Sequence, residues 1–438
     1  MRLLRLGMRG PSVEMLQLAL LRAGYNIKGS NKGIDGIFGN STDLAVRQFQ
    51  RDNGLTSDGI VGAVTWKKLI PYITGYVRYR VVPGDTFYKI AKRYGTTTQA
   101  IGLANPSIIP NNLAVGVIIN VPIGFYNGEN TVTYGEISYT WELMSLFIDG
   151  ITARYPFLET FTIGESTLQR GLYCIKYGKG DTAVMYNASH HANEWITTPV
   201  LLKYVENLSK AYAFGGNVGG YNARELFERC RFYIVPMVNP DGVDLVNGYF
   251  EKDSEVYKSA KQLADNYPNI EFPSGWKANI RGVDLNLNYP AGWEQARQIK
   301  FAQGYTSPGP RDYVGPYAFS ETESIALGNF TRLNKLKLTL SYHTQGQVIF
   351  WKYLDFQPEG SLEIGRKLSE VSGYSLELTP TSSGYAGYKD WFIQEFNRPG
   401  YTIECGIGEN PLPVSQFDEI YKDNEPLMSV AAWEAVNL

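Results

Sequence analysis

The spacing of apolar positions divides the chain into an N-terminal part of short helices and a longer part in which helices and strands alternate. Over residues 12–25 apolar side chains recur every three or four positions, which predicts an amphipathic helix. From about residue 131, helical stretches such as 196–213 alternate with short apolar runs at 182–189, 231–239, 336–343 and 401–406. This alternation predicts an α/β domain with a mixed, mostly parallel sheet and helices on both faces.

A short motif is repeated within the first seventy residues. Asp35-Gly-Ile-Phe-Gly39 followed by Thr42 recurs as Asp58-Gly-Ile-Val-Gly62 followed by Thr65. Each copy predicts a glycine turn that leads into a helix, whose start Asp and Thr can cap. Together with the preceding helix, this echo resembles the three-helix peptidoglycan-binding domain of wall hydrolases. The resemblance covers residues 2–71 and implies a module that attaches to the cell wall.

A second module follows, and it opens with YRVVPGDTFYKIAKRYG from Tyr79 and closes with VGVIINVP. The pattern predicts a strand, two helices and a closing strand. It resembles a LysM domain over residues 78–123, a family that binds glycans containing N-acetylglucosamine. By position, the resemblance implies that glycan contacts come from two loops, made of Gly84, Asp85, Thr86, Phe87, Asn105, Pro106 and Ile109.

Composition and charge narrow the class of protein. The 438 residues carry 41 Lys and Arg against 43 Asp and Glu, a net charge of −2, which argues against a generally basic nucleic-acid-binding protein. Charged residues make up 19% and hydrophobic residues 44%, as in folded proteins. A polar, turn-rich linker at 123–134 separates the modules from the long α/β region. We therefore expect domains at residues 2–71, 78–123 and 131–438.

Cysteine usage and the N-terminus bear on the cellular setting. Cys174, Cys230 and Cys405 all lie in apolar runs, which predicts buried reduced thiols rather than disulfides. Arg5 and Arg9 interrupt any apolar signal segment, and no run approaches the length of a membrane span. We expect no membrane span, and action in the cytoplasm of a sporulating bacterium or at the spore or cell wall after release.

A zinc site is predicted by the few histidines of the chain. His191 and Glu194 stand three residues apart at a predicted helix start, so their side chains can converge on one cation. His343 ends an apolar run and is the distant third candidate, while His190 is a competing ligand four residues before Glu194. Two histidines, one glutamate and an open position are typical of catalytic zinc, so we expect one Zn²⁺ per chain.

Glu404 lies within an apolar strand pattern, YTIECG, where an unpaired carboxylate is costly. Beside a zinc ion it could act as general base on water and return the proton to a leaving amine. A buried structural ion pair is the alternative interpretation of Glu404.

Five ordered motifs over residues 131–438 resemble the zinc carboxypeptidase superfamily: HHANEW, VPMVNPDGV, RGVDLNLNYP, SYHTQGQ and KDW followed by TIEC. The resemblance implies His191, Glu194 and His343 as zinc ligands and Glu404 as general acid and base. It also implies a cation that polarises the scissile carbonyl, for which Lys277 and Arg281 both remain candidates. Lys277 has the better position, and Arg281 the always-charged, bidentate side chain.

Several positions depart from that family. Carboxypeptidases hold a free C-terminus with Asn-Arg in a DxNRN motif, where this chain has Asn286, Leu287 and Asn288. The mobile tyrosine position falls on Ser382, with Tyr385 nearby, and the pocket-floor position is Lys389. We expect Asn286, Asn288, Tyr385 and Lys389 to contact substrate. A cation at 389 suits an acidic substrate group, either that of diaminopimelate or a D-glutamyl carboxylate.

These features predict a zinc endopeptidase that cleaves the γ-D-glutamyl-meso-diaminopimelate bond of peptidoglycan stem peptides, with glycan strands bound by the N-terminal modules. The combination of wall-binding modules and catalytic domain resembles the endopeptidases of sporulating bacilli. One alternative is a carboxypeptidase that releases C-terminal residues, which Leu287 disfavours. The other is a wall-binding protein without catalysis, which the complete set of ligands and Glu404 disfavours.

Overall fold

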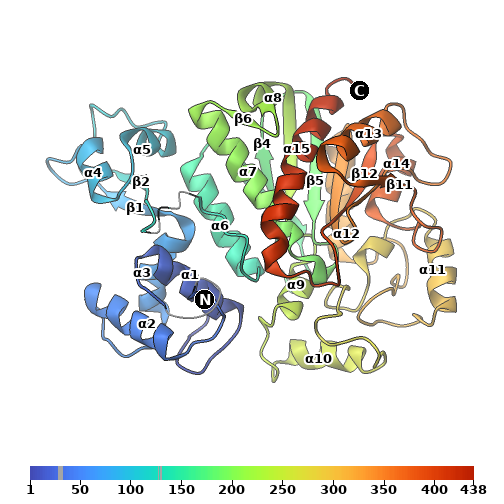
Figure 1. Ribbon diagram of the computed structural model, residues 1–438, viewed down its shortest axis with the longest axis horizontal. Helices are drawn as coiled ribbons and strands as arrows, with labels where there is room; N and C mark the ends of the chain where they lie inside the picture. Colours follow the sequence, from blue (N-terminus) through green and yellow to red (C-terminus); the bar gives the residue numbers. More distant parts are fainter. Residues whose placement is uncertain (28–32, 127, 129–130) are drawn as a thin grey trace. The chain divides into compact units, whose positions relative to one another are not determined.

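The structure is a computed structural model that describes residues 1–27, 33–126, 128 and 131–438. Residues 127, 129 and 130 of the predicted linker lie outside this description. The chain forms two compact units, of which the first comprises 1–138 with 142–159 and the second 139–141 with 160–438 (Figure 1).

The first unit begins with three helices, and the repeated motif forms two matching turns between them. Gln17 donates hydrogen bonds to Asp35 Oδ1 (2.8 Å) and Thr42 Oγ1 (3.2 Å). Gln50 donates to the equivalent atoms of the second copy, Asp58 Oδ1 and Thr65 Oγ1, at 2.9 and 3.3 Å. The echo in the sequence is therefore a repeated structural clamp. The helices are α1 (Pro11–Arg22), α2 (Asn40–Asp52) and α3 (Ala63–Thr74).

The same unit continues into a two-stranded antiparallel sheet with two helices. Alternate apolar residues of the strands pack on the inner faces of the helices, around Phe87, Ile90, Ile101 and Ile119. The order strand, helix, helix, strand is the one that the sequence predicts. The elements are β1 (Tyr76–Arg80), α4 (Phe87–Arg93), α5 (Thr98–Ala104) and β2 (Ile118–Pro122), and a further helix of this unit is α6 (Trp141–Arg154).

The second unit is built on an eight-stranded sheet in the order β11-β10-β12-β9-β5-β8-β4-β3. The central strands β12, β9, β5 and β8 pair in parallel, whereas β10 and β4 pair antiparallel with β12 and β8. The strands are β3 (Glu159–Glu165), β4 (Gly171–Tyr177), β5 (Thr182–Ala188), β8 (Cys230–Val235), β9 (Leu338–Thr344), β10 (Val348–Phe350), β11 (Ser375–Glu377) and β12 (Gly400–Cys405).

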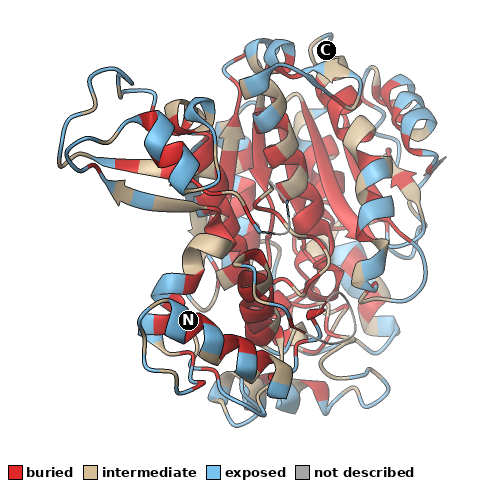
Figure 2. Cartoon of the chain, turned by 60° about the vertical axis from the view of Figure 1, so that its left-hand side comes forward, coloured by how far each residue is buried: buried red, intermediate tan, exposed pale blue. Residues whose placement is uncertain are grey.

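Helices cover both faces of this sheet because successive residues of its strands point to opposite sides. Met185 of β5 joins the core with Leu327 of α12 (Thr322–Leu333) and Trp391 of α14 (Tyr388–Phe396). The next residue, Tyr186, lies on the other face, where its ring contacts Tyr204 of α7 (Thr197–Phe214) and its hydroxyl donates to a backbone carbonyl of α15 (Phe417–Ala435). Figure 2 shows the buried residues gathered along the strands. The predicted α/β class, with a mixed sheet and helices on both faces, is confirmed.

The helices of the second unit are α7 (Thr197–Phe214), α8 (Ala223–Arg229), α9 (Pro240–Val246), α10 (Glu255–Ala264), α11 (Trp293–Ala302), α12 (Thr322–Leu333), α13 (Ser361–Ser372), α14 (Tyr388–Phe396) and α15 (Phe417–Ala435), with single turns η2 (Ala192–Glu194), η3 (Leu285–Leu287) and η4 (Val414–Gln416) and a hairpin β6 (Asn217–Val218), β7 (Tyr221–Asn222). Cys174, Cys230 and Cys405 are buried free thiols, as predicted. Within the described residues, no helix is both long and apolar enough to cross a membrane.

Candidate active site

Three predicted metal ligands meet at the carboxyl ends of two neighbouring parallel strands. His191 and Glu194 follow β5 and enter η2, and His343 lies at the end of β9, the strand beside β5. His191 Nδ1 lies 2.9 Å from Glu194 Oε1, and His343 Nδ1 lies 2.8 Å from Glu194 Oε2. The two Nδ1 atoms are 3.2 Å apart. Ligand atoms of all three residues thus converge on one point.

The carboxylates around this cluster favour a positive charge at the point where the ligand atoms converge. Burial would lower the pKa of His191, but the carboxylates of Glu194 and Asp284 raise it to about 9. Asp284 Oδ1 lies 3.1 Å from the outer nitrogen of His191, the arrangement that commonly orients a zinc-binding imidazole. Two histidines and one glutamate form the usual donor set of catalytic zinc, so these residues fit the metal.

His190, the competing ligand, is turned away from this point. Its Nε2 lies 3.1 Å from the hydroxyl of Tyr289, and burial holds its pKa well below the usual value. Among the described residues, the group that could hold a metal consists of His191, Glu194 and His343 without it. The directions of the two side chains favour His191 over His190 as the predicted ligand.

Glu404 lies beside the ligand cluster on β12. In the sheet it is the register partner of His343, and its side chain lines the same cavity as His191 and Lys277. Burial, followed by repulsion from Glu194, raises the pKa of Glu404 to about 8. A carboxyl group whose pKa lies near neutrality can both take up and release a proton, which suits a general acid and base.

Of the two candidate cations, Lys277 is the one at the cluster. Its Nζ lies 3.1 Å from Glu194 Oε1, and it lines the cavity beside His191. The neighbouring carboxylates outweigh the effect of burial and raise the pKa of Lys277, so the ammonium stays charged. Arg281 is 55% exposed and pairs with Glu321 at 3.6 Å.

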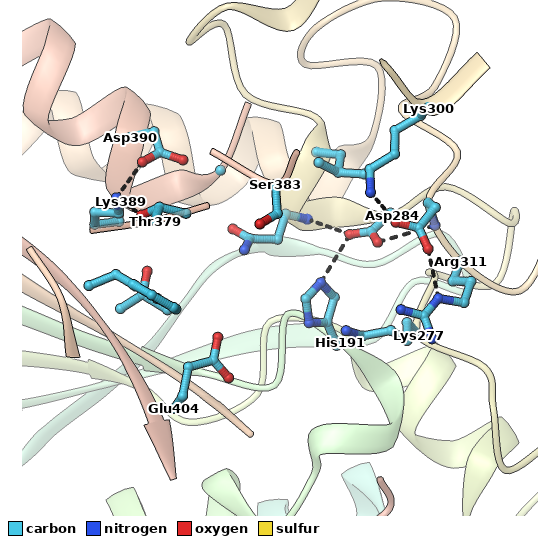
Figure 3. A pocket seen from close by; sticks show the side chains of 16 residues that line it. His191, Lys277, Asp284, Lys300, Arg311, Thr379, Ser383, Lys389, Asp390 and Glu404 are labelled. Atoms are coloured by element: carbon cyan, nitrogen blue, oxygen red, sulfur yellow. Dashed lines mark hydrogen bonds and ion pairs between the residues drawn. The ribbon is translucent and has the colours of Figure 1, made fainter. Parts of the chain in front are cut away.

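The cavity beside the cluster has a volume of about 220 Å³ and contains charges of both signs (Figure 3). Lys389 lies on one side, where its Nζ contacts Lys352 O (2.8 Å), Thr379 Oγ1 (3.1 Å) and the carboxylate of Asp390 (2.5 Å). Lys277 and Arg311 lie on the other side in Figure 3. Cations therefore lie at both ends of this cavity.

The remaining predicted substrate residues are divided between the cavity and the core. Asn286 lines the cavity, and its Oδ1 accepts a hydrogen bond from the backbone of Tyr388. Asn288 is completely buried, and its amide donates to the backbone carbonyls of Val314 and Tyr317. The Tyr385 ring packs on an apolar cluster outside the cavity lining. The lining serine of this loop is Ser383, next to the predicted Ser382.

Two basic residues at this site, Lys300 and Arg311, are not among the site residues predicted from the sequence. Both line the cavity, and both form ion pairs with Asp312, at 2.6 and 2.7 Å. The only sequence signal for Arg311 is an Arg-Asp pair inside the turn-rich stretch SPGPRDYVG, and Lys300 lies on α11. Nothing in that stretch indicates that it folds back beside the predicted metal ligands.

The first predicted glycan loop is held largely by its own hydrogen bonds. Asp85 Oδ2 accepts a 2.6 Å hydrogen bond from the hydroxyl of Tyr79, and the Thr86 hydroxyl caps the start of α4. The side chain of Phe87 lies in the core, and Gly84 has a φ of +80°, which favours glycine. In this loop, backbone groups are therefore more available for contact with a glycan than the side chains of Asp85, Thr86 and Phe87.

The second loop differs in exposure. The amide of Asn105 donates to the carbonyl of Asn120, and its oxygen accepts from the Asn120 backbone N–H at 2.8 Å. Pro106 is exposed and Ile109 is 65% exposed. Of the two loops, the second leaves apolar side chains available to a ligand.

Comparison with known protein families matches all three parts of the chain. Residues 144–426 match the zinc carboxypeptidase family, residues 9–69 the peptidoglycan binding domain and residues 79–122 the LysM domain. γ-D-Glutamyl-L-diamino acid endopeptidase 1 of Lysinibacillus sphaericus is 41% identical over 290 residues, 66% of this chain and 71% of that protein. Carboxypeptidase B of Bos taurus is 24% identical over 283 residues, 60% of this chain and 62% of that protein.

Solved structures share the fold. The crystal structure of thrombin-activatable fibrinolysis inhibitor superimposes with a TM-score of 0.54 at 23% identity, covering 70% of this chain and 79% of that chain. Carboxypeptidase A from Helicoverpa armigera gives a TM-score of 0.54 at 18% identity, covering 71% of this chain and 77% of that one.

Proposed function

Because the chain belongs to the zinc carboxypeptidase family, we propose that it is a zinc endopeptidase for the γ-D-glutamyl-meso-diaminopimelate bond of peptidoglycan stem peptides. The observation that carries this proposal is Glu404, with its raised pKa, beside the converging His191, Glu194 and His343. The name of the relative from Lysinibacillus sphaericus supports the substrate.

The residues around the ligand cluster suit amide hydrolysis. Zinc, when bound, acts as a Lewis acid and makes water a stronger nucleophile near neutral pH. Glu404 takes a proton from the attacking water and passes it to the leaving amine as the C–N bond breaks. Lys277 donates a hydrogen bond to the carbonyl oxygen as negative charge develops there. The products are a free γ-carboxyl group and a free amine.

The cavity beyond the cluster supports an endopeptidase with an acidic substrate. Leu287 stands where carboxypeptidases carry the arginine that pairs with a C-terminal carboxylate, and it lines the cavity as an apolar wall. Lys389 and Asp390 place an ammonium and a carboxylate side by side, which matches the zwitterionic far end of diaminopimelate. Asn286 also lines this cavity, where it can bind the substrate backbone.

We also propose that residues 2–71 and 78–123 are wall-binding domains and that 131–438 is the catalytic domain. Two wall-binding domains on one chain raise the local concentration of enzyme at an insoluble substrate. In the second domain, the exposed Ile109 is the side chain that we expect to matter most. Cosedimentation of the full chain with insoluble peptidoglycan tests this. Ile109→Asp should lower the bound fraction, and the equally exposed Val115→Asp should leave it unchanged.

Mass spectrometry of the products from L-Ala-γ-D-Glu-meso-diaminopimelate tests the central proposal. We expect L-Ala-D-Glu and free diaminopimelate, loss of cleavage with a zinc chelator, and recovery when zinc is returned. Release of C-terminal residues from ordinary peptides, with no cut at the γ-linkage, would instead favour the carboxypeptidase alternative. Binding to the wall without any cleavage would favour the non-catalytic alternative.

A further inference from the structure

Arg311 belongs to a segment that the backbone holds rigidly at the edge of the active site. The backbone N–H groups of Lys277 and Ala278 both donate to Pro310 O, at 2.7 and 2.9 Å. Two residues after Arg311, the carbonyl of Tyr313 accepts a 2.8 Å hydrogen bond from the N–H of Asp284. The backbone therefore fixes Arg311 between Lys277 and Asp284, and the carboxylate of Asp284 contacts His191.

The side chain of Arg311 is anchored at one atom and open at the others. Its Nε lies 2.7 Å from Asp312 Oδ2, while Lys300 Nζ lies 2.6 Å from the other oxygen of Asp312. Asp312 itself has a φ of +65°, an unusual backbone conformation that concentrates at functional sites. The Arg311 side chain remains 41% exposed and lines both this cavity and a second one that shares His191 and Glu404 with it. Its terminal amino groups can therefore donate to a ligand.

The other cations at the site are differently placed or committed. Lys300 is 11% exposed and paired with Asp312. Lys277 contacts the metal ligand Glu194. Lys389 lies across the cavity from Arg311 (Figure 3). Among the described residues that line this cavity, Arg311 is the cation with both exposure and a fork of free N–H donors next to the reacting centre.

We propose that Arg311 binds a carboxylate of the substrate next to the scissile amide and thereby determines specificity. Two such groups flank a γ-glutamyl bond to diaminopimelate: the α-carboxylate of D-Glu and the carboxylate at the L-centre of diaminopimelate. A guanidinium binds a carboxylate through two parallel hydrogen bonds, which Leu287 cannot supply at the family position. Asp312 and Lys300 act as positioning residues for this fork. The inference rests on the proposed function.

Kinetics on amidated substrates test this assignment. kcat/KM is measured for the natural tripeptide, for the form with D-isoglutamine in place of D-Glu, and for the form amidated at the L-centre carboxylate of diaminopimelate. Arg311→Gln should lower kcat/KM on the natural substrate about 10- to 100-fold, the range for a lost charged hydrogen bond. Amidation of the bound carboxylate should lower kcat/KM of the wild type by a similar factor. On that amidated substrate, Arg311→Gln should have the same kcat/KM as the wild type. The amide that shows this non-additive result identifies which carboxylate is bound.

Arg311→Lys should recover only part of the lost kcat/KM, because an ammonium lacks the planar fork of a guanidinium. This partial recovery also distinguishes loss of the guanidinium from a folding defect in Arg311→Gln. The control is Arg297→Gln, an exposed arginine on α11 paired with Glu294, which should behave as wild type. Additive losses on both amides would overturn the inference while leaving the proposed function intact. If the wild type fails to cut the γ-linkage at all, both are overturned.

Discussion

Gln50 in the three-helix module and Glu194 in the active site are both only 1% exposed, yet their surroundings differ in kind. The amide of Gln50 donates to Asp58 and Ile60 O and accepts from the N–H of Gly59, so donors meet acceptors. The carboxylate of Glu194 instead faces two imidazoles and an ammonium within 3.1 Å. The first arrangement is complete in itself and stabilises a fold. The second concentrates charge, as functional sites do.

Glu404→Gln gives the largest expected effect and tests whether the charged cluster is functional. The amide cannot accept the proton of the attacking water, so kcat should fall roughly 10²- to 10⁴-fold on the γ-linked tripeptide. Zinc content and melting temperature should stay close to wild type, because Glu404 is not a ligand and its replacement removes a buried carboxyl with an unfavourable charge.

The matched control is Glu370→Gln, the same change at an exposed position of α13. It should leave kcat unaltered. Full activity in Glu404→Gln would show that Glu404 is not the general base, and loss of zinc together with activity would show that it helps to hold the metal.

Replacing the two candidate cations separately sharpens the same contrast. Lys277→Met should lower kcat roughly 10²- to 10³-fold, the cost of losing one donor to the developing oxyanion. Arg281→Met should have little effect, since that side chain pairs with Glu321 and is half exposed. Steady-state kinetics of both variants on one substrate decide the point. A larger loss with Arg281→Met would reverse the assignment.

The local parts of this site could be predicted from the sequence, and the parts assembled by folding could not. His191 and Glu194 are neighbours in one motif, and His343 and Glu404 end strands whose apolar runs are plain, so their convergence follows from the parallel sheet. Arg311 reaches the cavity through a loop that only backbone contacts in the folded chain position.

The choice between close candidates also escapes the sequence. Lys277 and Arg281 are four residues apart in an irregular segment, whose path decides which one faces the metal ligands. Similarly, the LysM resemblance implies glycan contacts for Asp85 and Asn105, yet both side chains form hydrogen bonds within the chain itself. Polarity in a loop does not reveal whether a side chain is already satisfied.

The pH profile should show a smaller effect of the same cluster. Glu404 must be ionised to act as a base, so kcat/KM should rise about tenfold per pH unit below its working pKa and level off above it. Its pKa is raised to about 8 by burial and by Glu194, and lowered by Lys277. Zinc, another cation, lowers it further. Lys277→Met should therefore move the acidic limb to higher pH, whereas Arg281→Met should not. A shift to lower pH would contradict the assignment.

Gln50→Met gives the smallest effect on chemistry and tests the other side of the comparison. Methionine preserves volume and helix propensity but leaves the partners of the Gln50 amide unsatisfied, so the first unit should lose roughly 1–3 kcal/mol of unfolding free energy. Gln48→Met, an exposed position on the same helix, should cost almost nothing. Cleavage of a soluble tripeptide should be unchanged in both variants. If Gln50→Met lowered kcat on that substrate while the first unit kept its stability, this clamp would have a functional role. A buried polar side chain with all its hydrogen bonds made could then no longer be taken as structural in this chain.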